Sequence, residues 1–348
     1  MAQATSIGLG LRRVVEILAA RGIDPQPLLR RAGLAAPDPT SRDLLVPAQA
    51  EATLIELAAQ TAGDAILGIA MVEGVNPRDA GLLYYLFSTA ATLRQALTLL
   101  ARYVPIANAG LALTISSSAG GDAIVELRHV GLQRSRLKHA AEFQTAVLVK
   151  MARQIVDRQI SPAFVSFAHR RSFGIREIER YFDCPVRYGA EADLIAISSE
   201  SLDLRVAYAD DRLLELLEPY GDRIVAARGH PCESLRAAVE NIIQKLLPDG
   251  QARLDAIAAA LGTSSRSLSR RLAEEGVSFS EVLDDLRRTL SLQYLADPDL
   301  SVDRAANLLG YGDVGAFTHA FRRWTGHTPS QARGDPQMLA HLNNAPER

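Results

Sequence analysis

The residues best suited to chemistry in this chain are two arginines, Arg266 and Arg270, which stand four positions apart. A guanidinium is a rigid fork of N–H donors that can hold guanine O6 and N7 with paired hydrogen bonds, or pair with a phosphate. The four-residue spacing places both side chains on one face of a helix, with Ser269 at its edge, and Leu268 and Leu272 fall on the opposite face. These residue types suggest contact with nucleic acid.

A second amphipathic segment, 314–324, presents a less basic face. Its apolar positions are Phe317, Ala320, Phe321 and Trp324. The residues on the other side are Gly315, Thr318, His319 and Arg322. Val314 and Gly315 supply no side-chain donor, so this segment is the weaker candidate for reading bases.

An internal repeat lies behind these two segments. Segments 254–262 and 302–310 carry apolar residues at the same helical spacing before a glycine, and they are offset by 302 − 254 = 48 residues. Each ends at a glycine, Gly262 or Gly310, where a left-handed helix cap is easiest. A capping residue, Ser264 or Asp313, follows within three positions and starts a new helix. Each copy therefore predicts a helix-turn-helix, although a single copy would also fit an ordinary helical hairpin used for protein contacts.

The segment between the two copies, 279–296, has the apolar spacing of one long helix. At about 1.5 Å per residue it spans about 27 Å. Such a helix could hold two recognition helices roughly one DNA turn, about 34 Å, apart on one face of a duplex. One polypeptide would then read two successive segments of the major groove.

The region from about 232 to 333 resembles the AraC/XylS family of transcription regulators. The resemblance is carried by the run Leu309-Gly310-Tyr311-Gly312-Asp313-x-x-Ala316-Phe317-x-x-Ala320-Phe321-Arg322-Arg323-Trp324-x-Gly326-x-x-Pro329-Ser330, and by 261–272 in the first copy. It implies that Arg266, Ser269 and Arg270 face base edges. In the second copy Gly315, Thr318, His319 and Arg322 occupy the DNA-facing positions, with His319 where an arginine is common. We expect the first half-site to be read more stringently, and the second helix to anchor phosphates.

The first two thirds of the chain read as an α+β region. Residues 7–103 are mostly helical, and 111–117 and 123–130 alternate like paired strands. Further along we expect helices at 136–158 and 175–182 and strands at 163–169 and 194–198. The predicted fold is an α+β N-terminal sensor domain, with helices and a small, mainly antiparallel sheet, followed by an all-α domain with two helix-turn-helix units.

The N-terminal region is similar to the arabinose-binding-type domain found in a subset of AraC-type regulators. This resemblance rests on 82–85, on 164–169 and on 182–188, and it implies effector sensing and self-association. Residues with polar tips on otherwise apolar elements are the candidates for effector binding. They are Tyr84, Tyr85, Tyr103, Arg128, His129 and His169. The alternative for each is a satisfied core residue, and the spacing of the histidines fits no recurrent metal site.

Domain boundaries are expected where glycine and proline interrupt the helical pattern. We predict an effector-binding and dimerisation domain at 1–204, a linker helix at 205–230, a DNA-binding domain at 231–335 and a C-terminal tail at 336–348. The parting point is Arg228-Gly229-His230-Pro231. Between 231 and 335 acidic residues slightly outnumber basic ones, so tight non-specific DNA binding is not expected.

Composition fits an ordinary globular protein of the cytoplasm. The hydrophobic share is 48%, the charged share 22% and the formal net charge −2 at pH 7. Two cysteines, Cys184 and Cys232, are too few for a disulfide framework and lack zinc-site spacing. No stretch approaches the roughly 20 apolar residues of a membrane helix. No cofactor and no metal is predicted.

Together these patterns predict an effector-controlled, sequence-specific DNA-binding activator and not an enzyme. Its expected partners are double-stranded promoter DNA with direct repeats, RNA polymerase, an unknown small-molecule effector and a second copy of the chain. One alternative is a repair enzyme in which Cys184 or Cys232 accepts an alkyl group from DNA. The other is an architectural protein that binds DNA without regard to sequence.

Overall fold

The structure is a computed structural model that describes residues 4–36, 44–118, 120–130, 132, 137–156, 158–228, 235–335, 337–339 and 342. The described residues form two compact units, one up to residue 228 and one from residue 235. The expected parting point at 229–231 and most of the expected tail at 336–348 lie outside the described residues.

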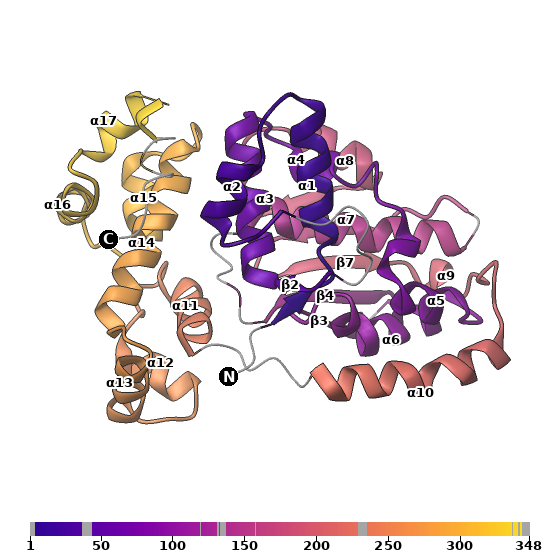
Figure 1. Cartoon of the computed structure of the whole chain (residues 1–348). Helices are drawn as coiled ribbons and strands as arrows, with labels where there is room; N and C mark the ends of the chain where they lie inside the picture. The colour runs from indigo at the N-terminus through magenta and orange to yellow at the C-terminus, as the bar shows by residue number, and fades with distance from the viewer. Residues whose placement is uncertain are drawn as a thin grey trace. The chain divides into compact units, whose positions relative to one another are not determined.

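The first unit combines helices with a small sheet, as predicted (Figure 1). Its helices are α1 (Leu9–Ala20), α2 (Gln26–Ala32), α3 (Ala48–Ala62), α4 (Leu67–Ala70), η1 (Pro77–Ala80), α5 (Leu82–Ser88), α6 (Leu93–Tyr103), η2 (Val104–Ile106), α7 (Lys138–Ile155), α8 (Ile175–Phe182), α9 (Ser199–Leu202) and α10 (Asp211–Arg228). Its strands are β1 (Thr5–Ser6), β2 (Val46–Pro47), β3 (Leu111–Ser117), β4 (Ala123–His129), β5 (Phe164–Phe167), β6 (Val186–Tyr188) and β7 (Asp193–Ile197).

Five of the strands form one sheet in the order β3-β4-β7-β5-β6. All neighbours are antiparallel except β5 and β6, so the sheet is mainly antiparallel, as expected. Along β4 the residues alternate: Val125 and Leu127 are buried, whereas Glu126 and Arg128 are exposed. This alternation is typical of a sheet with one face in the core and one in water. The short strand β6 was not predicted.

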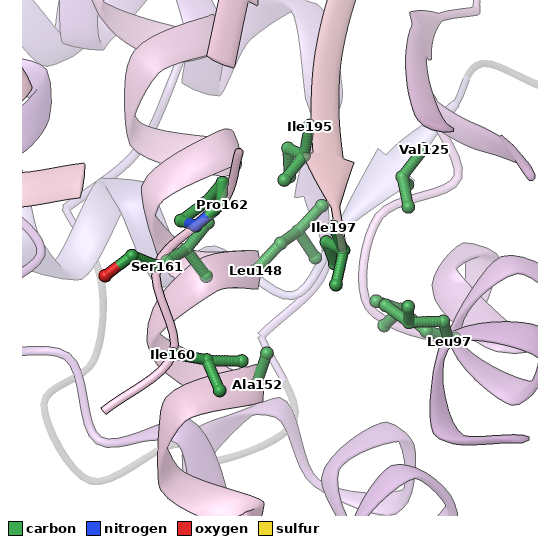
Figure 2. Close-up of a pocket in the computed structure, with 11 residues that line it drawn as sticks. Leu97, Val125, Leu148, Ala152, Ile160, Ser161, Pro162, Ile195 and Ile197 are labelled. Carbon is green, nitrogen blue, oxygen red and sulfur yellow. The ribbon is translucent and has the colours of Figure 1, made fainter. Parts of the chain in front are cut away.

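Helices α6 and α7 pack against the buried face of the sheet. Figure 2 shows Leu97 of α6 and Leu148 of α7 beside Ile195 and Ile197 of β7. Together with their neighbours these side chains line a small, almost wholly apolar cavity of about 20 Å³. The core of the first unit is thus built between the sheet and two helices.

Helix α10, which falls within the predicted linker helix, is an integral part of the first unit. Leu214 is buried, and a Cβ on Gly221 would come within 2.8 Å of the Tyr103 ring, so this glycine lets the helix lie close to α6. The Tyr103 hydroxyl donates to Asp222 Oδ1 at 2.9 Å, and Arg228 Nη1 donates to the Pro105 carbonyl at 3.0 Å. These bonds fix both the middle and the end of α10.

The second unit is entirely helical in its described part. Its helices are α11 (Leu235–Leu246), α12 (Leu254–Ala260), α13 (Ser265–Glu274), α14 (Phe279–Ala296), α15 (Val302–Leu308), α16 (Val314–Thr325) and α17 (Pro329–Gly334). Helix α14 begins and ends at the predicted residues, and a capping box formed by Ser278 and Glu281 fixes its start. In Figure 1 the α12–α13 pair lies at one end of α14 and the α15–α16 pair at the other. The predicted two helix-turn-helix units are confirmed.

Candidate nucleic-acid interface

The first helix-turn-helix is formed by α12 and α13. Ala258 of α12 is 1% exposed, and its small side chain allows α13 to approach. Gly262 in the turn has a φ of +64°, a conformation that favours glycine. Ser264 then caps α13, because its side chain accepts a hydrogen bond from the Ser267 N–H at 3.2 Å. Leu268 and Leu272 are fully buried and anchor α13 to the core.

The opposite face of α13 carries the predicted base readers. Arg266, Ser269 and Arg270 are all exposed. Arg270 lies 3.6 Å from Glu274, but both side chains are about two-thirds exposed or more, and such pairs contribute little. Arg266 forms no ion pair with any residue that the structure describes. Arg271, which sequence reasoning did not single out as a contact residue, is exposed on the same helix.

The second helix-turn-helix, α15 and α16, repeats this construction with larger core residues. Gly310 has a φ of +71°, and a Cβ there would lie 2.6 Å from the Leu247 carbonyl oxygen, so no other residue fits without a shift. Asp313 caps α16 by accepting from the Ala316 N–H at 2.7 Å. Phe317 and Phe321 are fully buried where the first unit of the repeat has leucines.

The outward face of α16 is chemically different. Gly315, His319 and Arg322 are exposed and Thr318 is half-buried. The neighbouring Arg323 pairs with Asp284 of α14 at 2.6 Å. Arg322 is therefore the arginine of α16 that remains available to a partner within the described part of the chain.

The two capping residues set the correspondence between the recognition helices. Ser264 and Asp313 are offset by 313 − 264 = 49 residues, one more than the repeat, because the second turn has an extra residue. At this offset Gly315, Thr318 and His319 take the places of Arg266, Ser269 and Arg270. Two guanidinium groups in the first helix are thus replaced by a glycine and a histidine in the second.

Helix α14 holds the two pairs in fixed positions. It packs against α11 on one side and against α15, α16 and α17 on the other. Leu286 and Leu290 are buried in this contact. Arg287 Nε donates to the Leu309 carbonyl at 3.0 Å, and its guanidinium lies 4.5 Å from the centre of the Tyr311 ring, which ties the second turn to α14. Arg287 therefore serves the scaffold.

The predicted effector-binding residues are not brought together by the fold. Tyr84 and Tyr103 are 3% and 0% exposed in the core, whereas Tyr85 and Arg128 are exposed. His129 is buried 3.5 Å from Asp193, and both of its ring nitrogens lack a hydrogen-bond partner among the described residues. None of these residues lines the cavity of Figure 2 or the larger one described below. Their role in effector binding stays a prediction.

The sixth candidate, His169, belongs to a buried charged cluster. Its Nε2 lies 2.9 Å from Glu142 of α7, and Arg171 donates to both oxygens of the same carboxylate at 2.7 and 2.5 Å. Burial alone would raise the pKa of Glu142, but the hydrogen bond with His169 and the charge of Arg171 bring it down to about 2. Arg171 also donates to the Phe173 carbonyl, so the cluster fastens the loop after β5 to α7.

Other chemistry finds little support in the described residues. Burial raises the pKa of the Cys184 thiol to about 11, so it is a poor nucleophile, and Cys232 lies outside the described residues. The described part of the chain holds no group of three or more His, Cys, Asp or Glu side chains placed to bind a metal. Within the same part, no helix is long and apolar enough to cross a bilayer.

Two family models match the chain. The first, described as the arabinose-binding domain of AraC transcription regulator, N-terminal, covers residues 22–206. The second, a helix-turn-helix domain, covers residues 257–335. The matched segments contain the sheet with most of its helices and both helix-turn-helix pairs.

Known regulators are similar over long stretches. The ornithine utilization regulator of Pseudomonas aeruginosa is 27% identical over 274 residues, 79% of this chain and 80% of that protein. The transcriptional regulator VirS of Mycobacterium tuberculosis is 26% identical over 322 residues, 91% of this chain and 93% of that protein. Among solved structures, the regulator CdpR from Pseudomonas aeruginosa aligns with a TM-score of 0.46 and 23% identity, over 94% of this chain and 98% of that one.

Proposed function

Because the chain belongs to the AraC family of DNA-binding transcription regulators, we propose that it activates particular promoters under the control of a small-molecule effector bound to its N-terminal unit. The observation that supports sequence-specific DNA binding is the exposed, basic face of α13. Arg266 and Arg270 are exposed while their neighbours Leu268 and Leu272 are buried, so the guanidinium groups are held outward by the core itself.

The recognition helices α13 and α16 have different roles in DNA binding. Arg266, Ser269 and Arg270 read base edges in one major-groove segment, where each bidentate arginine contact is worth about 1–3 kcal/mol of discrimination. Thr318, His319 and Arg322, with the backbone at Gly315, bind the next segment chiefly through phosphates. The first half-site is consequently the more specific one.

Activation requires more than one partner. The operator contains direct repeats, the chain acts as a homodimer in the cytoplasm, and bound protein contacts RNA polymerase beside the promoter. An effector controls promoter activation only if it binds one arrangement of the protein more tightly than another. A relative named as the urease operon transcriptional activator of Escherichia coli, 35% identical over 102 residues, supports the direction of regulation.

Selection of DNA from a random pool tests this proposal. We expect a motif with two parts about 10 base pairs apart, the first richer in invariant positions. Arg270→Ala should relax the preference at one position of the first part. Arg304→Ala, which removes an exposed arginine of α15 outside the recognition helices, should leave the motif intact. Recovery of no motif would favour an architectural protein. The repair enzyme is tested separately, by mass spectrometry after exposure of the chain to alkylated DNA: a stoichiometric alkyl adduct on Cys184 or Cys232 would favour it.

A further inference from the structure

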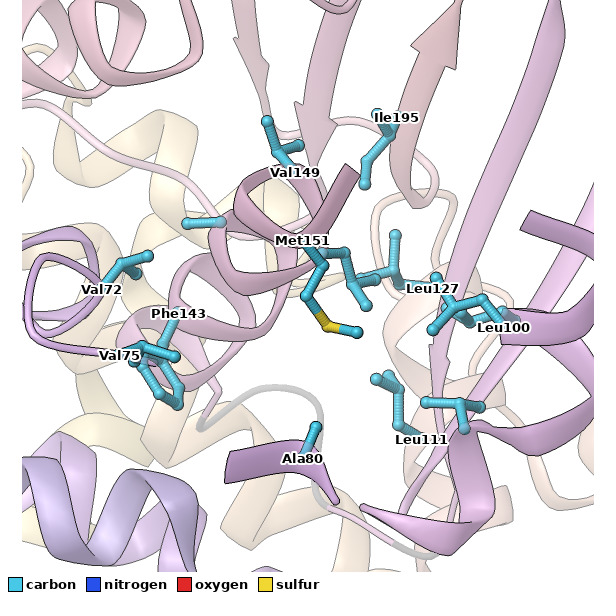
Figure 3. Close-up of a cluster of buried hydrophobic side chains, with 14 of the residues drawn as sticks. Val72, Val75, Ala80, Leu100, Leu111, Leu127, Phe143, Val149, Met151 and Ile195 are labelled. Carbon is cyan, nitrogen blue, oxygen red and sulfur yellow. The ribbon is translucent and has the colours of Figure 1, made fainter. Parts of the chain in front are cut away.

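The first unit contains a cavity of about 80 Å³, counted as the space open to the centres of water molecules, that no residue predicted from the sequence touches. It lies between α1, α3, α5 and α7, with β3 and the residues of η2 closing one side. Figure 3 shows Phe143 and Met151 of α7 next to Ala80 and Leu111, which border it. Its polar lining residues are Ser6, Glu51, Asn108 and Gln144, and the other described lining residues are apolar or glycine.

The size and the walls of this cavity are those of a ligand site. One water molecule needs roughly 10–15 Å³ on this measure, so the cavity has room for several waters or one small molecule. Binding pockets for small molecules combine apolar walls with a few polar groups. Protein cores are otherwise close-packed, and empty space of this size is unfavourable. On α7 the residues Gln144 and Val147, which face the cavity, are half-buried, while most of the helix is fully buried.

Two of the polar groups of the cavity, on Glu51 and Gln144, present acceptor oxygens. Glu51, which is 5% exposed, uses Oε1 to accept the Leu11 N–H at 3.0 Å. Gln144 Oε1 is buried and has no hydrogen-bond partner in the described part of the chain. Among the lining residues that the structure describes there is no Lys, Arg or His. A ligand can therefore satisfy Gln144 and Glu51 with hydrogen-bond donors, but an anion would meet a carboxyl and no cation.

A purely structural role accounts for only part of this arrangement. Helix α3 carries a second glutamate, Glu56, whose carboxylate accepts the Ala140 N–H at 3.0 Å and so caps α7 much as Glu51 caps α1. Glu56 does not line the cavity. Capping explains one oxygen of Glu51, but it explains neither the unpaired Gln144 amide nor the open space between them.

We propose that this cavity binds the effector, and that the effector is a small, mainly apolar molecule whose polar group is an uncharged or cationic hydrogen-bond donor, an amine or a hydroxyl, and not an anion. This inference rests on the proposed control by an effector. The donor lies between Glu51 and Gln144, and the apolar body of the ligand contacts Phe143, Val147 and Met151.

The environment of Glu51 suits such a donor. Burial raises the pKa of its carboxyl, and the hydrogen bonds from Ser6 and from the backbone at Leu11, with the charge of Arg12, offset this only in part. An ammonium group would favour the ionised carboxylate, whereas a hydroxyl can donate a hydrogen bond to either form.

The cavity also borders the segment that holds α10. Val104 of η2 lines the cavity, and the carbonyl of the next residue, Pro105, accepts the hydrogen bond from Arg228 at the end of α10. The Tyr103 hydroxyl, one residue earlier, holds Asp222. A ligand that shifts η2 would therefore change the attachment of the last helix of the first unit.

Calorimetric titration of the full chain with matched probes tests this proposal. Phenylethylamine, phenylethanol and their aliphatic counterparts share one shape with phenylacetate, which is anionic. We expect the amines or the alcohols to bind and phenylacetate to bind at least tenfold more weakly. Glu51→Gln, which keeps the acceptor for Leu11, should weaken amine binding at least tenfold, with little effect on the alcohol.

Two further variants test whether the probes bind in this cavity. Val147→Phe, which fills the cavity, should abolish binding of both probes, and Glu56→Gln, the matched control on α3, should change neither. Tighter binding of phenylacetate, binding unaffected by Val147→Phe, or no binding of any amine or alcohol would overturn the proposal. If the chain still selects a DNA motif in those cases, the ligand assignment fails alone; if it selects none, the proposed function fails.

Discussion

Charged side chains are buried in the first unit of this protein at a place where they pair, and they are exposed on the recognition helix of the second. In the first unit Glu142 and Arg171 are both fully buried and bound to each other. In the second unit Arg266 and Arg270 stand in water on a helix that is anchored by leucines. A buried pair fixes the shape of the unit that contains it, whereas an exposed guanidinium is free to bind something else. Charge thus serves the fold in one unit and recognition in the other.

The largest effect that this comparison predicts is at Arg171. Arg171→Met removes the bidentate partner of Glu142 and leaves a buried carboxylate with only His169 beside it, which costs about 3–5 kcal/mol of unfolding free energy. Urea unfolding followed by amide hydrogen exchange would assign the loss to the first unit. Arg128→Met, at an exposed arginine of β4, should change stability by less than about 0.5 kcal/mol. Equal effects of the two substitutions would break the comparison.

In the second unit, removal of a charge should affect DNA binding and leave folding unchanged. Arg266→Ala or Arg270→Ala should lower discrimination at one base pair by about 1–3 kcal/mol, with stability within about 0.5 kcal/mol of the original. His319→Ala, at the position equivalent to Arg270, should have a smaller effect on discrimination. Competition binding with single-base operator variants measures both.

Arg322 provides the control for this prediction. As a phosphate contact, its replacement by alanine should weaken binding to all sequences alike and reduce the salt dependence by about one unit of slope. A change in base preference at Arg322→Ala, with none at Arg266→Ala, would reverse the assigned roles of the two recognition helices.

The same contrast explains what the sequence could predict. The second unit is built from local signals: glycine turns, capping residues and apolar positions three and four residues apart. Each of these signals lies within about ten residues of its partner, so helices such as α14 could be placed to the residue. The exposure of Arg266 follows from the burial of Leu268 on the same helix.

The first unit depends on contacts between distant segments, which a sequence pattern does not reveal. Tyr103 was predicted to bind effector because it is a polar residue on an apolar helix, but its hydroxyl bonds to Asp222, 119 residues away. Glu51 and Gln144 face one cavity from helices far apart in the chain. The available signal was weak: a glutamate and a glutamine at positions of α3 and α7 where the helical period calls for apolar residues.

The pH dependence of stability should also separate the two units. Burial raises the pKa of Glu56 to about 8 from 4.5, despite its hydrogen bond from Ala140. The stabilisation from its neutral form is complete below pH 4.5 and is lost as the pH rises toward 8. Glu56→Gln should remove this loss and flatten the pH profile of the stability of the first unit.

In the second unit the pH dependence of stability has the opposite sign. Hydrogen bonds from the Ser278 backbone and hydroxyl lower the pKa of Glu281, so its stabilisation is present above the usual glutamate range and is lost as the pH falls. Hydrogen exchange of each unit between pH 4 and 9 would show opposite slopes. A common slope for both units would mean that Glu56 is ionised in the folded protein at neutral pH.

The smallest loss of stability is expected from removal of a helix cap in the second unit. Asp313 caps α16 at 2.7 Å and Ser264 caps α13 at 3.2 Å, and both are exposed. Each alanine substitution should cost about 1 kcal/mol of unfolding free energy, because water can replace the lost cap. Asp313→Ala also removes a negative charge beside the phosphate-binding face, so DNA affinity should fall less than stability does. A loss as large as that of Arg171→Met would show that exposure does not set the cost of losing a charge in this protein.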